Sequence, residues 1–323
     1  MNNKIALEEH FAIADSLSES AEYAVPGQWN VLERRLLDID GERLEEMDKN
    51  GIAFAILSLN APGVQSMFDR KKAVDYAKRA NDALAAAVSR HPDRYAAFAA
   101  IALQDPDEAC FELARAIREL KFKGVMVNGF SQIGDADSIV YYDDPRYRQF
   151  WATIAELGVP FYLHPRDPLP ERTTFYDGHP WLRGASWAFG VETGTHALRL
   201  MASGIFDTHP TLTAILGHLG EMLPYAIWRF DHRVTKRPRE IPANRTFTEY
   251  LRSNFYVTTS GNYHTTTLKC AIEELGVDRV MFSVDYPFEE CADAATWFDA
   301  CDIGDSARQK IGRGNAAQLF SLK

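Results

Sequence analysis

Two acidic residues and two histidines, far apart along the chain, have side chains of the kind that bind divalent metal ions. Glu8 and His10 lie in ALEEHFAI, His164 ends FYLH and Asp285 ends FSVD. Imidazole and carboxylate groups together suit Zn²⁺ or Mn²⁺, and an open coordination position admits a substrate oxygen. The sequence therefore predicts one divalent metal ion, zinc or manganese, bound by Glu8, His10, His164 and Asp285.

The spacing of the first two residues indicates a strand. Glu8 and His10 are two positions apart, which on a strand directs both side chains to one face and Glu9 to the other. Glu-x-His alone is a weak motif, and a single histidine near a strand end is more often structural. With His218, however, five such polar residues fall at four predicted strand ends. A purely structural role for all five is hard to defend, because buried carboxylates need a compensating charge.

Three residues are candidates for the catalytic chemistry: Asp285, His218 and Glu221. His218 follows the apolar run ILG, and Glu221 comes three residues later. A carboxylate commonly orients an imidazole or fixes its protonation. The alternative is that Glu221 is a charge at the start of a helix. Arg229 lies eight residues after Glu221, about two helical turns along the same face, and is either a substrate contact or a surface arginine.

These residues need elements that bring them together. Short β-like runs alternate with amphipathic helical segments, which indicates βαβ units around a parallel sheet. Eight such runs favour a closed (β/α)₈ barrel of the TIM type over an open doubly wound sheet. In such a barrel the carboxyl ends of the strands meet at one mouth, where catalysis takes place. We place the strands at 5–11, 54–59, 95–101, 124–128, 160–164, 212–218, 255–260 and 280–285.

The helical segments and loops complete this arrangement. The segment from Pro165 to about Thr193 is rich in Pro, Gly and aromatic residues, and we interpret it as an elaborate loop or lid after the fifth strand. The chain is expected to form a single domain over residues 1–323. Helices are predicted at 35–49, 72–90, 106–120, 144–157, 195–206, 224–233, 267–275 and 306–322.

The composition excludes several classes of protein. The 323 residues carry a formal charge of −10, and we find no basic stripe, which argues against a nucleic-acid partner. No run approaches the roughly 20 apolar residues that span a bilayer, so no membrane association is expected. The four cysteines form no CxxC pair, and the N-terminus lacks the apolar run of a signal peptide. A cytoplasmic enzyme with reduced thiols is the expectation.

Motifs along the whole chain carry a family resemblance. KIALEEHFAI, GVMVNGFSQ, VPFYLHPRDPLP, ILGHLGEMLPY, FSVDYPFE and IGRGNAAQLF resemble the decarboxylase branch of the amidohydrolase superfamily, and most of all its γ-resorcylate (2,6-dihydroxybenzoate) decarboxylase group. The resemblance implies a distorted barrel, one divalent metal, no organic cofactor, a small aromatic acid as substrate and a homotetramer. It also implies non-oxidative, reversible decarboxylation of a hydroxybenzoate, with Asp285 protonating the ring carbon.

The resemblance also discriminates within the superfamily. Many amidohydrolases carry His-x-His where this chain has Glu8 and His10, and the 2,3-dihydroxybenzoate and salicylate relatives commonly read EEAF instead of EEHF. His10 therefore favours 2,6-dihydroxybenzoate as substrate. Tyr286 departs from the pattern, because the resorcylate enzymes usually have Trp there. A 2,3-dihydroxybenzoate or salicylate decarboxylase therefore stays an alternative. A metal-dependent hydrolase on the same barrel is a second alternative, and a non-catalytic barrel that binds a small ligand or serves in an assembly is a third.

The resemblance assigns substrate contacts as well. It places Asn128 beside the substrate, and this neutral residue at the end of the fourth strand indicates a site with one metal ion. It strengthens the interpretation of Arg229 as a substrate contact. Tyr23, Phe189 and Phe288 correspond to positions that line the substrate, and a flat ring suits such apolar walls.

Overall fold

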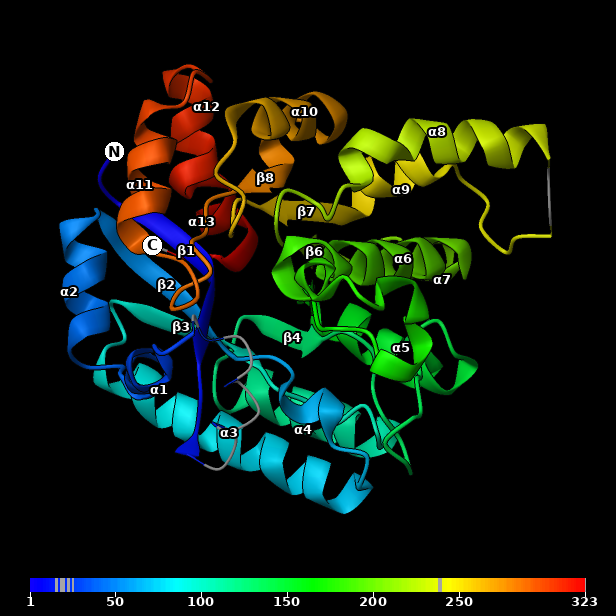
Figure 1. The fold of residues 1–323 in the computed structure, drawn as a ribbon, viewed down its shortest axis with the longest axis horizontal. Helices are drawn as coiled ribbons and strands as arrows, with labels where there is room; N and C mark the ends of the chain where they lie inside the picture. Colours follow the sequence, from blue (N-terminus) through cyan, green and yellow to red (C-terminus); the bar gives the residue numbers. More distant parts are fainter. Residues whose placement is uncertain (15–16, 18–20, 22–23, 25, 238–239, 323) are drawn as a thin grey trace.

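The fold is built around one parallel sheet. The computed structural model describes residues 1–14, 17, 21, 24, 26–237 and 240–322. Eight strands follow one another in chain order, each neighbouring pair is parallel, and the helices lie outside them (Figure 1). This agrees with the predicted (β/α)₈ barrel. The strands are β1 (Lys4–Phe11), β2 (Ile52–Leu59), β3 (Tyr95–Ala99), β4 (Gly124–Asn128), β5 (Phe161–His164), β6 (Ala214–Leu216), β7 (Phe255–Thr258) and β8 (Val280–Met281).

The barrel interior is filled at one end by apolar side chains from most of the strands. Parallel strands are covered on both faces, which explains why their sequences are apolar almost throughout. In β1 all eight residues are buried. The interior cluster combines Ile5, Leu7, Ile56, Phe98, Met126, Tyr162, Ile215 and Met281, and Ala316 and Phe320 from the C-terminal helix pack against it.

A register shift in β1 turns its two metal-binding residues inward. Ile5 and Leu7 face the barrel interior, so strict alternation would place Glu9 there next. The pairing with β2 shifts register between Ala6 and Glu9. A bulge of this kind re-aims the side chains that follow it. As a result Glu8 and His10 share the inner face, as their spacing predicted.

The seam between β8 and β1 is not a regular ladder. Among the described residues no ladder pairs these two strands. Two backbone hydrogen bonds bridge them instead: Asp285 N–H donates to Glu8 O at 3.0 Å, and His10 N–H donates to Tyr286 O at 2.7 Å. The seam therefore joins the two segments that carry three of the four predicted metal ligands.

The helices differ from the predicted ones in places. The predicted helix at 35–49 is two helices, because Asp38 Oδ1 and Oδ2 accept hydrogen bonds from Gly41 N–H and Arg43 N–H and turn the chain. The predicted helix at 195–206 begins earlier and ends before Gly204, whose φ is +76°. The helices are α1 (Trp29–Leu37), α2 (Glu42–Lys49), α3 (Arg70–Arg90), α4 (Pro106–Arg118), α5 (Arg148–Leu157), α6 (Ala188–Ala202), α7 (Ile205–Thr208), α8 (Leu223–Lys236), α9 (Phe247–Asn254), α10 (Thr265–Leu275), α11 (Cys291–Ala300), α12 (Asp305–Gln309) and α13 (Asn315–Phe320).

Other segments complete the comparison with the sequence. Helices α9 and α11 were not predicted. The long segment after β5 contains four short 3-10 turns between Pro170 and Ser186 and then enters α6. Within the described part of the chain, no helix combines the length and the apolar character needed to cross a membrane.

Candidate metal centre and active site

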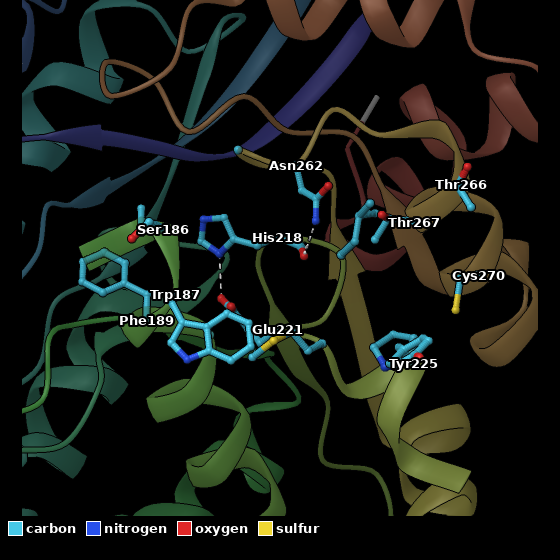
Figure 2. A pocket seen from close by; sticks show the side chains of 16 residues that line it. Ser186, Trp187, Phe189, His218, Glu221, Tyr225, Asn262, Thr266, Thr267 and Cys270 are labelled. Atoms are coloured by element: carbon cyan, nitrogen blue, oxygen red, sulfur yellow. Dashed lines mark hydrogen bonds and ion pairs between the residues drawn. The ribbon is translucent and has the colours of Figure 1, made fainter. Parts of the chain in front are cut away.

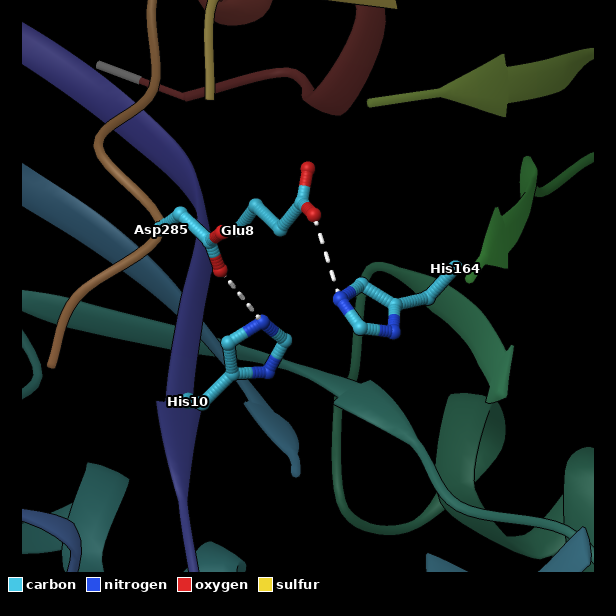
Figure 3. Close-up of side chains that lie close together, drawn as sticks. All are labelled: Glu8, His10, His164 and Asp285. Carbon is cyan, nitrogen blue, oxygen red and sulfur yellow. Dashed lines mark ion pairs between the residues drawn. The ribbon is translucent and has the colours of Figure 1, made fainter. Parts of the chain in front are cut away.

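The structure brings the four predicted metal-binding side chains together at the barrel mouth. Each offers one ligand atom, and these atoms lie within 4.8 Å of one another. His10 Nε2 is 3.1 Å from Asp285 Oδ1, and His164 Nε2 is 3.2 Å from Glu8 Oε1. Figure 3 shows the two imidazoles and two carboxylates turned toward one another from β1, β5 and the segment after β8.

The carboxylate of Glu8 is fixed through one oxygen. Tyr162 Oη and Ser260 Oγ donate short hydrogen bonds to Glu8 Oε2, and Thr258 Oγ1 donates at 3.3 Å. A Cβ at Gly217 would lie 2.6 Å from the same oxygen, so only glycine leaves room there. The other oxygen, Oε1, is thereby left facing the cluster.

The imidazole of His10 is oriented in the same manner. Ser58 Oγ hydrogen-bonds His10 Nδ1 at 3.3 Å, and the ring of Phe288 meets the imidazole edge-on with centroids 5.7 Å apart. An imidazole whose Nδ1–H donates to such a partner keeps the Nε2 lone pair for a metal ion. His10 Nε2 points at Asp285, so both residues face the same centre.

The electrostatics of the cluster call for a cation. Burial favours the neutral form of Glu8, but the nearby imidazoles of His218 and His164 outweigh it and hold the pKa of Glu8 well below its ordinary value. Burial likewise opposes ionisation of Asp285, yet His10 and His218 lower its pKa. Burial lowers the pKa of His10. Two ionised carboxylates and a neutral imidazole are a donor set for a divalent metal.

Unpartnered buried atoms test whether a metal ion fits. Glu8 Oε1 and His10 Nε2 are buried and make no hydrogen bond of good geometry within the described part of the chain. Polar atoms buried in this way are normally satisfied. Both face the cluster centre, so a cation bound there would satisfy them. The residues present therefore fit one divalent ion held by Glu8, His10, His164 and Asp285.

His218 and Glu221 form a pair beside this cluster. His218 Nδ1 lies 2.6 Å from Glu221 Oε1 (Figure 2). His218 Nε2 lies 3.5 Å from Asp285 Oδ2. Burial opposes protonation of His218, but the charges of Glu221 and Glu8 outweigh it and raise its pKa well above the ordinary value. The backbone φ is +51° at His218 and +84° at Asp285, a region that side-chain-bearing residues rarely adopt. Such strain is typical of functional sites.

A small cavity opens on the cluster. Its volume is about 320 Å³, and His164, His218 and Asp285 form its polar wall. Phe189 and Phe288, both predicted to line the substrate, contribute to its walls. The complete lining is Ala61, His164, Gly184, Ala185, Phe189, His218, Asp285, Phe288 and Glu289.

A second chamber adjoins the first. It has a volume of about 600 Å³ and shares Ala185, Phe189 and His218 with the smaller cavity. Figure 2 shows its side chains, among them Tyr225 from α8 and Cys270 from α10. His218 therefore lies between the two spaces.

Of the predicted substrate contacts, two line neither cavity, and a third is not among the residues that the structure describes. Asn128 is buried at the end of β4, where its Nδ2 donates to Leu59 O and Asn60 O, and it lines neither cavity. Arg229 is exposed on α8 and lines a separate depression with Phe230 and other residues. Tyr23 lies outside the described residues.

Several residues at the site were not predicted. Tyr162 lies two residues before His164 on β5, so strand alternation alone places both on one face. Thr258 and Ser260 repeat the same spacing at the end of β7. Glu289 lines the cavity four residues after Asp285. The spacing of the hydroxyl residues was a usable signal, whereas Glu289 follows from the turn after Asp285.

The barrel and its centre define a class of protein that sequence comparison identifies. Residues 24–322 match the family described as Amidohydrolase. The chain therefore belongs to this family, as the motifs along it suggested.

Individual relatives are similar over the whole chain. The gamma-resorcylate decarboxylase of Rhizobium radiobacter is 56% identical over 324 residues, which cover 100% of this chain and 99% of the relative. A crystal structure of 2,6-dihydroxybenzoate decarboxylase complexed with 2,6-dihydroxybenzoate has a TM-score of 0.98 at 55% identity and covers 100% of both chains. A dihydroxybenzoic acid decarboxylase from Polaromonas sp. JS666, with bound manganese and the inhibitor 2-nitroresorcinol, has a TM-score of 0.97 at 52% identity and covers 100% of this chain and 98% of its own.

Proposed function

We propose that this chain catalyses the non-oxidative, reversible decarboxylation of 2,6-dihydroxybenzoate to resorcinol and CO₂. The observation that carries the proposal is a cavity of about 320 Å³ with a metal-binding wall on one side and, apart from Glu289, small or aromatic apolar residues on the others. Such a space suits a flat ring with polar groups on one edge. The names of the relatives, which are 52–56% identical, support the same substrate.

The departure at Tyr286 does not argue for another isomer. Tyr286 is buried and contributes no side chain to the cavity wall. Its ring lies instead beneath the guanidinium of Arg43, 4.7 Å from the ring centroid. A change from Trp to Tyr at this position therefore leaves the residues that line the cavity unchanged, and the preference for 2,6-dihydroxybenzoate stands.

The residues of the cluster would bind a single divalent ion, for which we propose manganese because a relative contains it. When bound, the ion orients the substrate carboxylate and one ortho hydroxyl and stabilises negative charge on oxygen. Glu8, His10, His164 and Asp285 would hold it, and no organic cofactor is needed. Phe189 and Phe288 confine the ring and exclude water from it.

Asp285 can carry the proton because its two oxygens have different neighbours. Oδ1 faces His10, whereas Oδ2 faces His218. In our proposal the Asp285 carboxylate takes the proton of the substrate's ortho hydroxyl. It then delivers this proton to the ring carbon that bears the substrate carboxylate. The carbon–carboxylate bond then breaks, its electron pair restores the aromatic ring as a phenolate, and CO₂ leaves. The phenolate takes a proton from water.

His218 would act on the same substrate from the adjoining side. Glu221 holds its Nδ1, which directs Nε2 toward Asp285 and the cavity. A protonated imidazole in this position donates a hydrogen bond to the substrate carboxylate or to Asp285. Glu221 is thus a positioning residue for His218.

A substrate screen tests the function. Purified protein saturated with Mn²⁺ or Zn²⁺ is assayed for CO₂ release from 2,3-, 2,4- and 2,6-dihydroxybenzoate and salicylate, with metal content measured on the same sample. We expect 2,6-dihydroxybenzoate to be converted fastest and resorcinol to be carboxylated in bicarbonate. Failure to convert any of them by metal-replete protein would contradict the proposal, and hydrolysis products would favour the hydrolase. The homotetramer stays a prediction that light scattering tests.

A further inference from the structure

One polar side chain in the small cavity has no part in the metal cluster or the proposed mechanism. Glu289 lines the cavity beside Phe288, and the other lining residues outside the polar wall are alanine, glycine and phenylalanine. Phe288 N–H and Glu289 N–H both donate to Asp285 O, at 2.9 and 3.1 Å. The turn after Asp285 therefore fixes where Glu289 enters the cavity.

The carboxylate of Glu289 has capacity to bind a ligand. It is half-buried, and within the described part of the chain it makes neither a hydrogen bond nor an ion pair. The neighbouring Glu290, in contrast, is exposed and bonds Arg35 at 2.7 Å. A carboxyl group offers an acceptor oxygen in either protonation state, so a suitable partner for it in a small-molecule site is a donor such as a hydroxyl group.

The proposed substrate has one donor that the metal wall does not use. The substrate carboxylate and one ortho hydroxyl face the cluster, which leaves the second ortho hydroxyl beside walls that are otherwise apolar. In the free acid this hydroxyl donates to its own carboxylate and keeps that group in the ring plane. The carboxylate must leave the plane before the carbon–carbon bond breaks. A second acceptor beside the hydroxyl then compensates for the lost internal hydrogen bond.

We propose that Glu289 accepts a hydrogen bond from the second ortho hydroxyl and so distinguishes 2,6-dihydroxybenzoate from benzoates with a single ortho hydroxyl. This inference rests on the proposed function. Because the interaction strengthens as the substrate carboxylate turns out of the ring plane, it acts on kcat more than on KM.

The first test is the Glu289→Gln variant, with Glu290→Gln as a matched control of equal charge change outside the cavity. Gln keeps a neutral acceptor oxygen in place of the carboxylate, so for 2,6-dihydroxybenzoate we expect kcat/KM to fall by about fivefold or more, the difference between a hydrogen bond to a charged and to a neutral acceptor. For salicylate, the change stays within about threefold, measured as turnover or as a competitive inhibition constant. Metal content and the Glu290→Gln variant should match the unmodified protein.

The second test begins with the unmodified protein, so its first result does not depend on the folding of a variant. The unmodified protein is assayed with 2-hydroxy-6-methoxybenzoate, in which the second hydroxyl is methylated and cannot donate. In the unmodified protein this substrate should lose at least as much kcat/KM as 2,6-dihydroxybenzoate loses in Glu289→Gln, and the variant should not reduce its kcat/KM further. Equal losses for both substrates in the variant, or none, would overturn the inference. Lack of activity of the unmodified protein on every benzoate would instead refute the proposed function.

Discussion

The hydroxyl of Ser283 accepts a hydrogen bond from the backbone N–H of Glu8 at 2.7 Å. It also accepts from Leu7 N–H at 3.0 Å, so it satisfies two successive donors at the register shift of β1. In turn it donates to Glu9 Oε1 at 3.0 Å, and that oxygen also accepts from Val284 N–H. This side chain thereby adds to the two backbone hydrogen bonds across the seam between β8 and β1 and helps to fix Glu8 relative to Asp285.

Ser283→Ala should therefore weaken both the fold and the metal site. Two buried N–H groups lose their acceptor, which costs about 1–3 kcal/mol of unfolding free energy. Loss of a group that orients metal ligands weakens metal affinity roughly 10–100-fold. Denaturant unfolding and competitive metal titration measure the two effects. Ser89→Ala, on the exposed face of α3, is the control, and metal affinity equal to that control would show that the seam does not position the ligands.

Removing the metal ion should abolish decarboxylation and lower thermal stability together. Without a cation, the buried carboxylate of Glu8 and the partly buried carboxylate of Asp285 remain as neighbours. A ligand at 100 times its Kd stabilises by about 2.7 kcal/mol, so the melting temperature should fall by several degrees on chelation. Calorimetry with and without EDTA, followed by Mn²⁺ addition, measures this. In a His164→Ala variant chelation should have a much smaller effect; a shift of equal size there would place the ion elsewhere.

Asp285→Asn separates metal binding from proton transfer. The amide keeps one oxygen toward the cluster but cannot take up the hydroxyl proton. We expect the variant to bind Mn²⁺ more weakly, and kcat at saturating metal to fall about 100-fold or more. Single-turnover assays at several metal concentrations measure both quantities. Asp293→Asn, exposed on α11, is the control. Near-normal decarboxylation by Asp285→Asn would exclude it as the proton carrier.

The sequence predicted the ligands better than the contacts around them. Apolar runs that end in a polar residue predicted the ends of β4 and β5, whereas β6 and β8 end at Leu216 and Met281, before His218 and Asp285. The spacing of Glu8 and His10 survived because the register shift lies just before them. The shift itself has no signal in the residue pattern. For Arg229, helical spacing predicted the position along α8 but not the depression that its side chain lines. The break between α1 and α2 was readable, since the two Asp residues and the Gly of DIDG at 38–41 favour a turn over a continuous helix.

His196 should make the fold sensitive to acid. It is buried on α6, Tyr142 N–H donates to its Nε2 at 3.1 Å, and burial lowers its pKa to about 3. The folded state therefore keeps this imidazole neutral, whereas the unfolded chain protonates it below about pH 6.5. Because the unfolded state then binds more protons, stability falls with decreasing pH, by about 1 kcal/mol per pH unit from this residue.

His196→Gln retains an acceptor for Tyr142 but cannot be protonated. As the pH is lowered from 6.5 to about 4.5, the unfolding free energy of this variant should fall less steeply than that of the unmodified protein. The two slopes should differ by about 1 kcal/mol per pH unit. Urea unfolding of both proteins in the same metal-containing buffers measures the difference, since changes at the metal site then cancel. His264→Gln, at an exposed position, controls for loss of any histidine. Parallel pH profiles for His196→Gln and the unmodified protein would mean that His196 is not the acid-sensitive group.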